Sequence, residues 1–130
     1  MSSMSIINEL TVASVDNSIR FYQNNFGFAV ELTEGEPSTW AQLKKDDTIL
    51  MLEDYGQAKN EVDNYPAKTS SSNLLRFEYN DAEEIKTLYG SLNSNNVNFF
   101  MDYTETDYGK VEFGIYDPDR NMIIVSSLVR

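Results

Sequence analysis

Carboxylates are the side chains in this sequence with which most chemistry could be done. The 130 residues include 21 acidic and 10 basic side chains, a formal charge of −11, and neither His nor Cys. A Ser-His-Asp triad, a cysteine nucleophile, a disulfide and a thiolate metal site are therefore excluded, and a zinc or iron site would need carboxylates alone. Glu9, Glu53 and Tyr103 are the candidates for a general acid or base.

The charge also limits the partners of the protein. No basic stripe is available for the phosphates of a nucleic acid, whereas an acidic surface suits a cationic small molecule. The acidity could equally serve solubility alone. No apolar run reaches the roughly 18 residues of a membrane span. The start, MSSMSIINEL, lacks the features of a signal peptide, so we expect a cytoplasmic protein with no membrane or nucleic-acid partner.

The first half of the chain predicts the order βαβββ. In the first strand, Leu10 and Val12 face one side, and Ile7, Glu9 and Thr11 face the other. The four strands are expected at about residues 6–13, 28–33, 39–44 and 48–53.

A helix with a defined start and end follows the first strand. Ser14 or Asp16 can cap its first turn, and Gly27 ends it. Its apolar stripe is expected to consist of Ile19, Phe21, Tyr22 and Phe26.

The second half repeats this order, with Leu74 lying 67 residues after Ile7. Asn80 or Asp81 caps its helix, and the turn at residues 117–121 (DPDRN) joins its last two strands. The strands are expected at about residues 73–79, 97–103, 111–116 and 122–128. The helical stripe consists of Ile85, Leu88, Tyr89 and Leu92.

The repeat predicts the fold class. We expect an α+β protein in which two βαβββ modules form a curved, incompletely closed cup of mixed sheet, with the helices on its outer face. The chain is expected to be a single domain, residues 1–130, with modules at 5–56 and 73–130. The polar residues 57–72 predict a linker or surface loop between them.

Three stretches carry a family resemblance. Glu9-Leu10, Val12, Ser18, Phe21-Tyr22 and Gly27-Phe28 follow the pattern ELxVxDxxxSxxFYxxxLGF, and residues 50–55 (LMLEDY) and the closing YG…DPDRN hairpin follow two others. Together they resemble the vicinal-oxygen-chelate superfamily of glyoxalases, bleomycin-resistance proteins and dioxygenases, and in particular its bleomycin-resistance-like branch. This resemblance implies a homodimer, commonly with both chains completing each cup.

The resemblance also implies four positions at which enzymes of the superfamily carry metal ligands, usually His, Gln or Glu. In this sequence those positions hold Ile7, Met51, Leu74 and Ile124. None of these side chains can bind a hard divalent cation. We therefore expect no metal and no other cofactor, and the metal-assisted reactions of the superfamily would lose their Lewis acid.

These four side chains are expected to form the apolar floor of the cup, either as core filling or as a pocket for an apolar ligand. Two residues further along the same strands, on the same face, lie Glu9, Glu53, Arg76 and Ser126. Because the repeat relates Glu9 to Arg76, we expect these two to approach as an ion pair, the alternative being a solvated pair at the rim.

Aromatic side chains could complete such a cup. Trp40, Phe100 and Tyr103 could stack on a planar ligand, and each could equally belong to the core or to a dimer interface. The side of the sheet that residues 111–116 face is not predicted.

The favoured hypothesis is a metal-independent, non-enzymatic binding protein similar to the bleomycin-resistance proteins. It would sequester a cationic, partly aromatic small molecule in a cleft between protomers. Two alternatives stay open. One is a lyase-type or isomerase-type enzyme of the superfamily that works without a divalent metal, and the other is a structural or regulatory dimer whose cup is filled.

Overall fold

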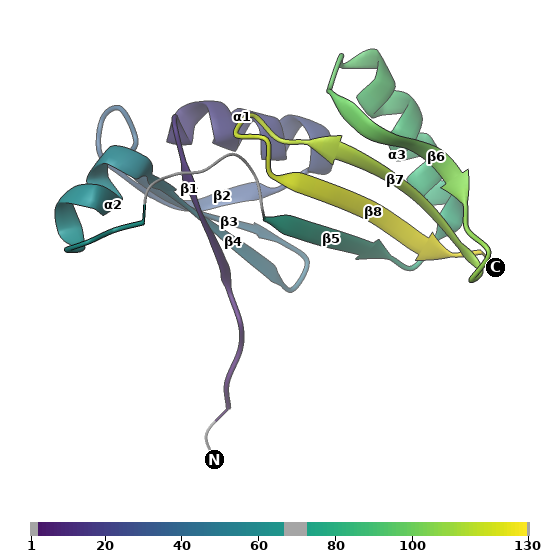
Figure 1. Cartoon of the computed structure of the whole chain (residues 1–130), viewed down its shortest axis with the longest axis horizontal. Helices are drawn as coiled ribbons and strands as arrows, with labels where there is room; N and C mark the ends of the chain where they lie inside the picture. Colours follow the sequence, from purple (N-terminus) through teal and green to yellow (C-terminus); the bar gives the residue numbers. More distant parts are fainter. Residues whose placement is uncertain (1–2, 67–72, 130) are drawn as a thin grey trace. The chain divides into compact units, whose positions relative to one another are not determined.

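The chain folds into two compact units, Met1–Lys68 and Thr69–Arg130 (Figure 1), in a computed structural model that describes residues 3–66 and 73–129. Each unit contains its own four-stranded mixed sheet with helices. The α+β class and the two βαβββ modules are confirmed. No helix in the described part of the chain is long and apolar enough to cross a membrane.

The first module has the strand order β1-β4-β3-β2, in which β1 runs parallel to β4 and the other neighbours are antiparallel. Its elements are β1 (Asn8–Val12), α1 (Val15–Phe26), β2 (Ala29–Glu34), β3 (Trp40–Lys45), β4 (Thr48–Asp54) and α2 (Tyr55–Glu61).

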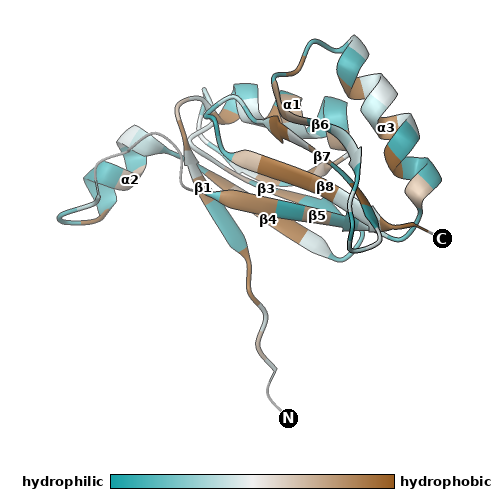
Figure 2. Ribbon diagram, turned by 45° about the vertical axis from the view of Figure 1, so that its right-hand side comes forward, coloured by the Kyte–Doolittle hydropathy of each residue, from teal (hydrophilic) through white to brown (hydrophobic). Residues whose placement is uncertain are grey.

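The second module has the equivalent order β5-β8-β7-β6, with β5 parallel to β8. Its elements are β5 (Leu74–Tyr79), α3 (Ala82–Ser94), β6 (Phe99–Glu105), β7 (Lys110–Tyr116) and β8 (Met122–Leu128). Apolar residues run along β8, and α3 shows alternating apolar and polar bands (Figure 2).

Helix α1 begins and ends where its capping residues predict. The Ser14 hydroxyl accepts a hydrogen bond from the Asn17 amide at 3.2 Å, and Gly27 takes the left-handed conformation at φ 78°. Tyr22 and Phe26 are buried as expected, but Ile19 and Phe21 are only half-buried. Val15 and Ser18 complete the buried face instead, because they lie two turns and one turn, respectively, before Tyr22 on the same side of the helix.

Helix α3 has the predicted stripe. Asp81 caps its first turn by accepting from the Glu83 amide at 2.9 Å. Ile85 and Leu92 are fully buried, and Tyr89 packs edge-on against Phe113 of β7. The helix therefore covers one face of the second sheet.

The predicted loop after β4 is wrong in its first part, because residues 55–61 form α2. Asp54 caps this helix through its carboxylate, which accepts from the Gln57 amide at 3.0 Å, and Ala58 is buried. One buried alanine and a cap stabilise this short helix, so no apolar stripe marks it in the sequence. The rest of the expected linker includes residues 67–72, which lie outside the described residues.

The turn of the closing hairpin is held by one buried side chain. The Asp117 carboxylate accepts from the amides of Asp119 and Asn121 and from the Asn121 side chain, at 2.8–2.9 Å. Arg120 itself takes the left-handed conformation at φ 64°, which strains a residue with a side chain. The Arg120 guanidinium lies over the ring of Tyr116 at 4.3 Å, which offsets part of the backbone strain.

Both sheets are irregular at one edge. The register of β2 against β3 shifts between Val30 and Leu32. The register of β6 against β7 shifts twice, between Phe99 and Met101 and between Met101 and Thr104. Strands β2 and β6 are the terminal strands of their sheets, so the shifts lie where pairing is weakest.

Candidate functional site

An open acidic cavity of about 350 Å³ lies in the first module. Three of its lining residues are predicted site residues, namely Glu9 of β1, Trp40 of β3 and Glu53 of β4. The structure therefore brings these three together. The other lining residues are Glu34, Thr39, Gln57 and Glu61.

Strand alternation places these side chains on one face of the first sheet. Leu10 and Val12 of β1 and Leu52 of β4 point to the opposite face and are buried. Glu9 and Glu53 alternate with them and so project into the cavity. In the sheet register, Trp40 lies between Glu34 of β2 and Glu53 of β4. The indole therefore has a carboxylate on either side, at cross-strand spacing.

Helix α2 supplies two of the four cavity residues that the sequence did not predict. It follows β4 directly, and it presents Gln57 from its first turn and Glu61 from its second turn to the cavity. The Gln57 side-chain amide donates to the Glu61 carboxylate at 2.7 Å, which fixes the orientation of both. Their four-residue spacing could have indicated this pair, had the segment been predicted as a helix.

The cavity disfavours a further negative charge. Burial raises the pKa of the Glu53 carboxyl, and the nearby charges of Glu61 and Glu9 raise it further. The close side chain of Glu61 and the charge of Asp54 act on this pKa in the same direction. A cation in the cavity would relieve this repulsion, so the site is electrostatically suited to a positively charged ligand.

The four positions at which a metal ligand was considered carry side chains without donor atoms for a hard cation. Ile7 is exposed and precedes β1, whereas Met51 is half-buried on β4 next to Glu9 in the register. Leu74 is half exposed and Ile124 half-buried on neighbouring strands of the second sheet. Among residues 3–66 and 73–129, no three Asp or Glu side chains gather closely enough to hold a metal ion. The residues present therefore do not fit the metal of the superfamily enzymes.

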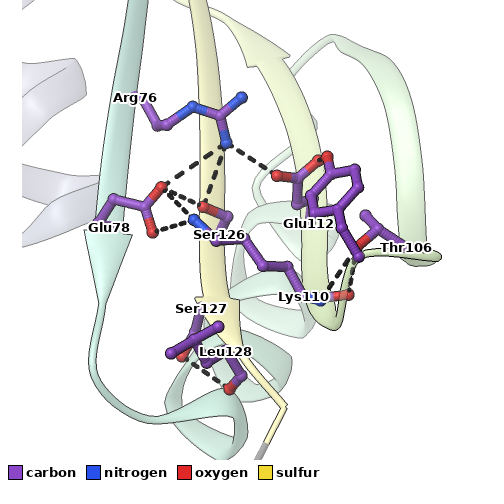
Figure 3. A network of polar contacts seen from close by, with 9 residues as sticks. Arg76, Glu78, Thr106, Lys110, Glu112, Ser126, Ser127 and Leu128 are labelled. Carbon is purple, nitrogen blue, oxygen red and sulfur yellow. Dashed lines mark hydrogen bonds and ion pairs between the residues drawn. The ribbon is translucent and has the colours of Figure 1, made fainter.

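A second polar cluster crosses the face of the second sheet opposite α3 (Figure 3). Arg76 of β5 donates to the Glu112 carboxylate of β7 at 2.8 Å and approaches the Ser126 hydroxyl of β8 at 3.4 Å. Ser126 donates to Glu78 at 2.8 Å, and Lys110 binds both oxygens of Glu78 at 2.9 and 3.0 Å. The structure thus brings together Arg76 and Ser126, as their places on neighbouring strands predict.

Glu112 is the residue of this cluster that the sequence did not predict. Only 5% of its side chain is exposed, and it also accepts from the Tyr108 hydroxyl at 2.9 Å. The hydrogen bond to Glu112 raises the pKa of Arg76, so the guanidinium stays charged. A charged residue in an alternating strand is ordinarily expected on an exposed face, whereas both faces of β7 are buried here, so the sequence did not indicate the position of Glu112.

The three predicted aromatics lie in different surroundings. Trp40 lines the acidic cavity. Phe100 lies on the face opposite α3, with its ring over Gly114 and 5.2 Å from the ring of Tyr116. Tyr103 instead packs 5.5 Å from Tyr89 of α3. Phe100 and Tyr103 are three positions apart on β6, so strand alternation places them on opposite faces, as the structure has them.

The expected ion pair between Glu9 and Arg76 would join the two modules and stays a prediction. Within its own module, Arg76 already has a partner in Glu112 and lies 3.7 Å from Glu78.

Comparison with protein families supports the resemblance. The model of the Glyoxalase/Bleomycin resistance protein/Dioxygenase superfamily matches residues 6–125. The chain belongs to this superfamily. Comparison with curated protein sequences finds no significant match.

Several solved structures have the same fold. TioX from Micromonospora sp. ML1 superposes with a TM-score of 0.79 at 12% identity, over 98% of this chain and 100% of TioX. Lactoylglutathione lyase from Agrobacterium tumefaciens superposes with a TM-score of 0.77 at 19% identity, over 98% of this chain and 96% of the lyase. A glyoxalase-related enzyme from Fulvimarina pelagi superposes with a TM-score of 0.79 at 17% identity, over 97% of this chain and 88% of that enzyme. At these identities the similarity shows the fold alone.

Proposed function

We propose that this superfamily member is a metal-independent binding protein that sequesters a small organic cation with an aromatic part. The observation that carries the proposal is the cavity of the first module, in which four carboxylates surround a single indole. A cation placed over Trp40 gains a cation–π interaction, and it neutralises the carboxylates on either side.

The net charge of −11 supports the same ligand class, because it attracts cations over a distance set by the salt concentration. Metal independence follows from the apolar residues Ile7, Met51, Leu74 and Ile124 at the former ligand positions. Binding of a cation should strengthen as the pH rises through the raised pKa of Glu53, since the carboxylate form attracts the ligand. The homodimer, the cleft between protomers and the cytoplasmic location remain predictions.

Tryptophan fluorescence tests the proposal, because Trp40 is the only tryptophan. Bleomycin and benzylammonium serve as cationic probes, and benzyl alcohol is the neutral analogue of the second. We expect saturable quenching by the cations that weakens with added salt, survives a chelator and is reduced in Glu9→Gln. Glu105→Gln, at the end of β6 in the other module, is the matched control and should leave quenching unchanged. Equal quenching by benzyl alcohol, or none by either cation, would count against the proposal.

One observation favours an enzyme as the second candidate. A carboxyl with a raised pKa next to a second carboxyl in an open cavity can act as a general acid, as Glu53 could with Glu61. Turnover of a bound cation that persists with a chelator and is lost in Glu53→Gln, with binding retained, would establish this alternative.

A further inference from the structure

The face of the second sheet opposite α3 places a guanidinium beside an apolar surface. In the register of that sheet, Arg76 of β5, Ile124 of β8 and Gly114 of β7 form one row. The Phe100 ring covers Gly114 from β6. Since neighbouring strands lie about 4.8 Å apart, the row spans about 10 Å between the strands of Arg76 and Gly114. A charged end, an aliphatic floor and an aromatic end thus lie within the length of one small molecule.

The guanidinium is held in place by a buried carboxylate. Glu112 is almost completely buried and accepts from Arg76 at 2.8 Å and from Tyr108 at 2.9 Å. A buried carboxylate needs such partners, because burial without them is costly. Arg76 is therefore fixed in one orientation before any ligand arrives, which lowers the entropy cost of binding.

One edge of this guanidinium is available. Every contact of Arg76 with Glu112, Ser126 and Glu78 is made by the same terminal nitrogen, Nη1. No contact from Nη2 or Nε to another described residue is present, and 42% of the side chain is exposed. In Figure 3 the second terminal nitrogen points away from Ser126 and Leu128, and the sheet register places Ile124 beside Arg76. The free edge is the two-donor fork that matches a carboxylate.

The surrounding charges permit an anion at this edge. Glu78 lies 3.7 Å from Arg76, but Lys110 binds both of its oxygens and Ser126 donates to it. Glu112 is neutralised by Arg76 itself. The cluster contains two cations and two carboxylates, so its net charge is zero in a chain of net charge −11.

We propose that this face of the second module binds an aromatic carboxylate. The carboxylate accepts from Nη2 and Nε of Arg76, and the ring lies on Ile124 against Phe100. Glu112 is the positioning residue for Arg76. This site differs from the cation cavity of the first module in both charge and residues, so it goes beyond the proposed function.

The test is an NMR titration of the arginine side-chain Nε–Hε signals of the full chain with benzoate. We expect a saturable downfield shift of the Arg76 signal, with the signal of Arg20 unmoved. Benzylammonium should leave the Arg76 signal in place, and acetate should bind more weakly because it lacks the ring. Arg76→Lys should weaken benzoate binding by roughly tenfold, the effect of losing one charge-assisted hydrogen bond. The matched control Arg20→Lys should not weaken it.

Variants of Glu112 are informative only if they fold, so the wild-type signal is the primary measurement. An Arg76 signal that does not move, or that moves no more than that of Arg20, overturns the proposal. Equal affinity for acetate and benzoate would refute the apolar half of the site. Failure here leaves the cation site untouched, because Trp40 fluorescence reports on the other module.

Discussion

Replacing Gly114 by alanine should destabilise the protein, although the same change in an unobstructed strand would stabilise it. A Cβ at this position would lie 2.4 Å from Cζ and 2.6 Å from Cε1 of Phe100. Normal carbon contacts are about 3.5–4.0 Å, so the ring must retreat by about 1 Å. That movement disturbs its contact with Tyr116, whose ring centroid is 5.2 Å away.

The sign of the expected change in stability follows from two opposing contributions. Overpacking of a buried site costs roughly 1–3 kcal/mol. Replacing glycine also restricts the unfolded chain, which stabilises the folded state by about 0.4–1 kcal/mol. The net expectation is a loss of about 1–2 kcal/mol, or a fall in Tm of roughly 4–8 °C for a chain of this size.

Urea denaturation followed by circular dichroism measures this change. Gly90→Ala is the matched control, because a Cβ there meets no atom within 4 Å and the position lies in α3. It should stabilise by about 1 kcal/mol. Phe100→Ala should remove the cost of Gly114→Ala when the two are combined, since the obstructing ring is gone. A Gly114→Ala variant as stable as the parent protein would refute this account of the contact.

Two further predictions concern a cap and an ion pair. Ser14→Ala removes the hydrogen-bond acceptor for the Asn17 amide and should lower the unfolding free energy by about 1 kcal/mol. Ser91→Ala, on the exposed side of α3, is the control and should leave the unfolding free energy unchanged. Urea denaturation measures both. Burial alone would raise the pKa of Glu78, but hydrogen bonds from Lys110 and Ser126 hold it below its usual value. The stability from this carboxylate is therefore present above its ordinary pKa of about 4.3 and is lost as the pH falls through the lowered value. The stability difference between the parent and Glu78→Gln should shrink from pH 7 to acid, and a constant difference would contradict this.

Most of the fold could be predicted because its signals are local. Alternation placed Leu10 and Val12 on the buried side of β1, and Ser14 and Gly27 marked the ends of α1. Helix α2 was missed because its stability comes from the Asp54 cap and one buried alanine, which leave no periodic pattern.

The candidate site was less predictable because it depends on contacts between distant residues. Glu61 reaches the cavity only through α2, and Glu112 meets Arg76 across two strands of the second sheet. The strand that carries Glu112 is buried on both faces, and a period-two pattern ordinarily indicates one buried and one exposed face, so it did not indicate a buried carboxylate. Tyr103 was not separated from Phe100 because no facing was assigned to the side chains of β6, although a spacing of three positions puts them on opposite faces of a strand.

The irregular edge strands bear on the resistance of the two sheets to edge-to-edge aggregation. A terminal strand presents unpaired backbone groups that can recruit a strand of another molecule and begin aggregation. Strand β2 is exposed at all six positions, but it carries Glu31 and Glu34, and β6 carries Asp102 and Glu105. The register shifts bend both strands, and the acidic side chains repel a like strand. Each module has such an edge strand, and both edge strands combine a register shift with acidic side chains.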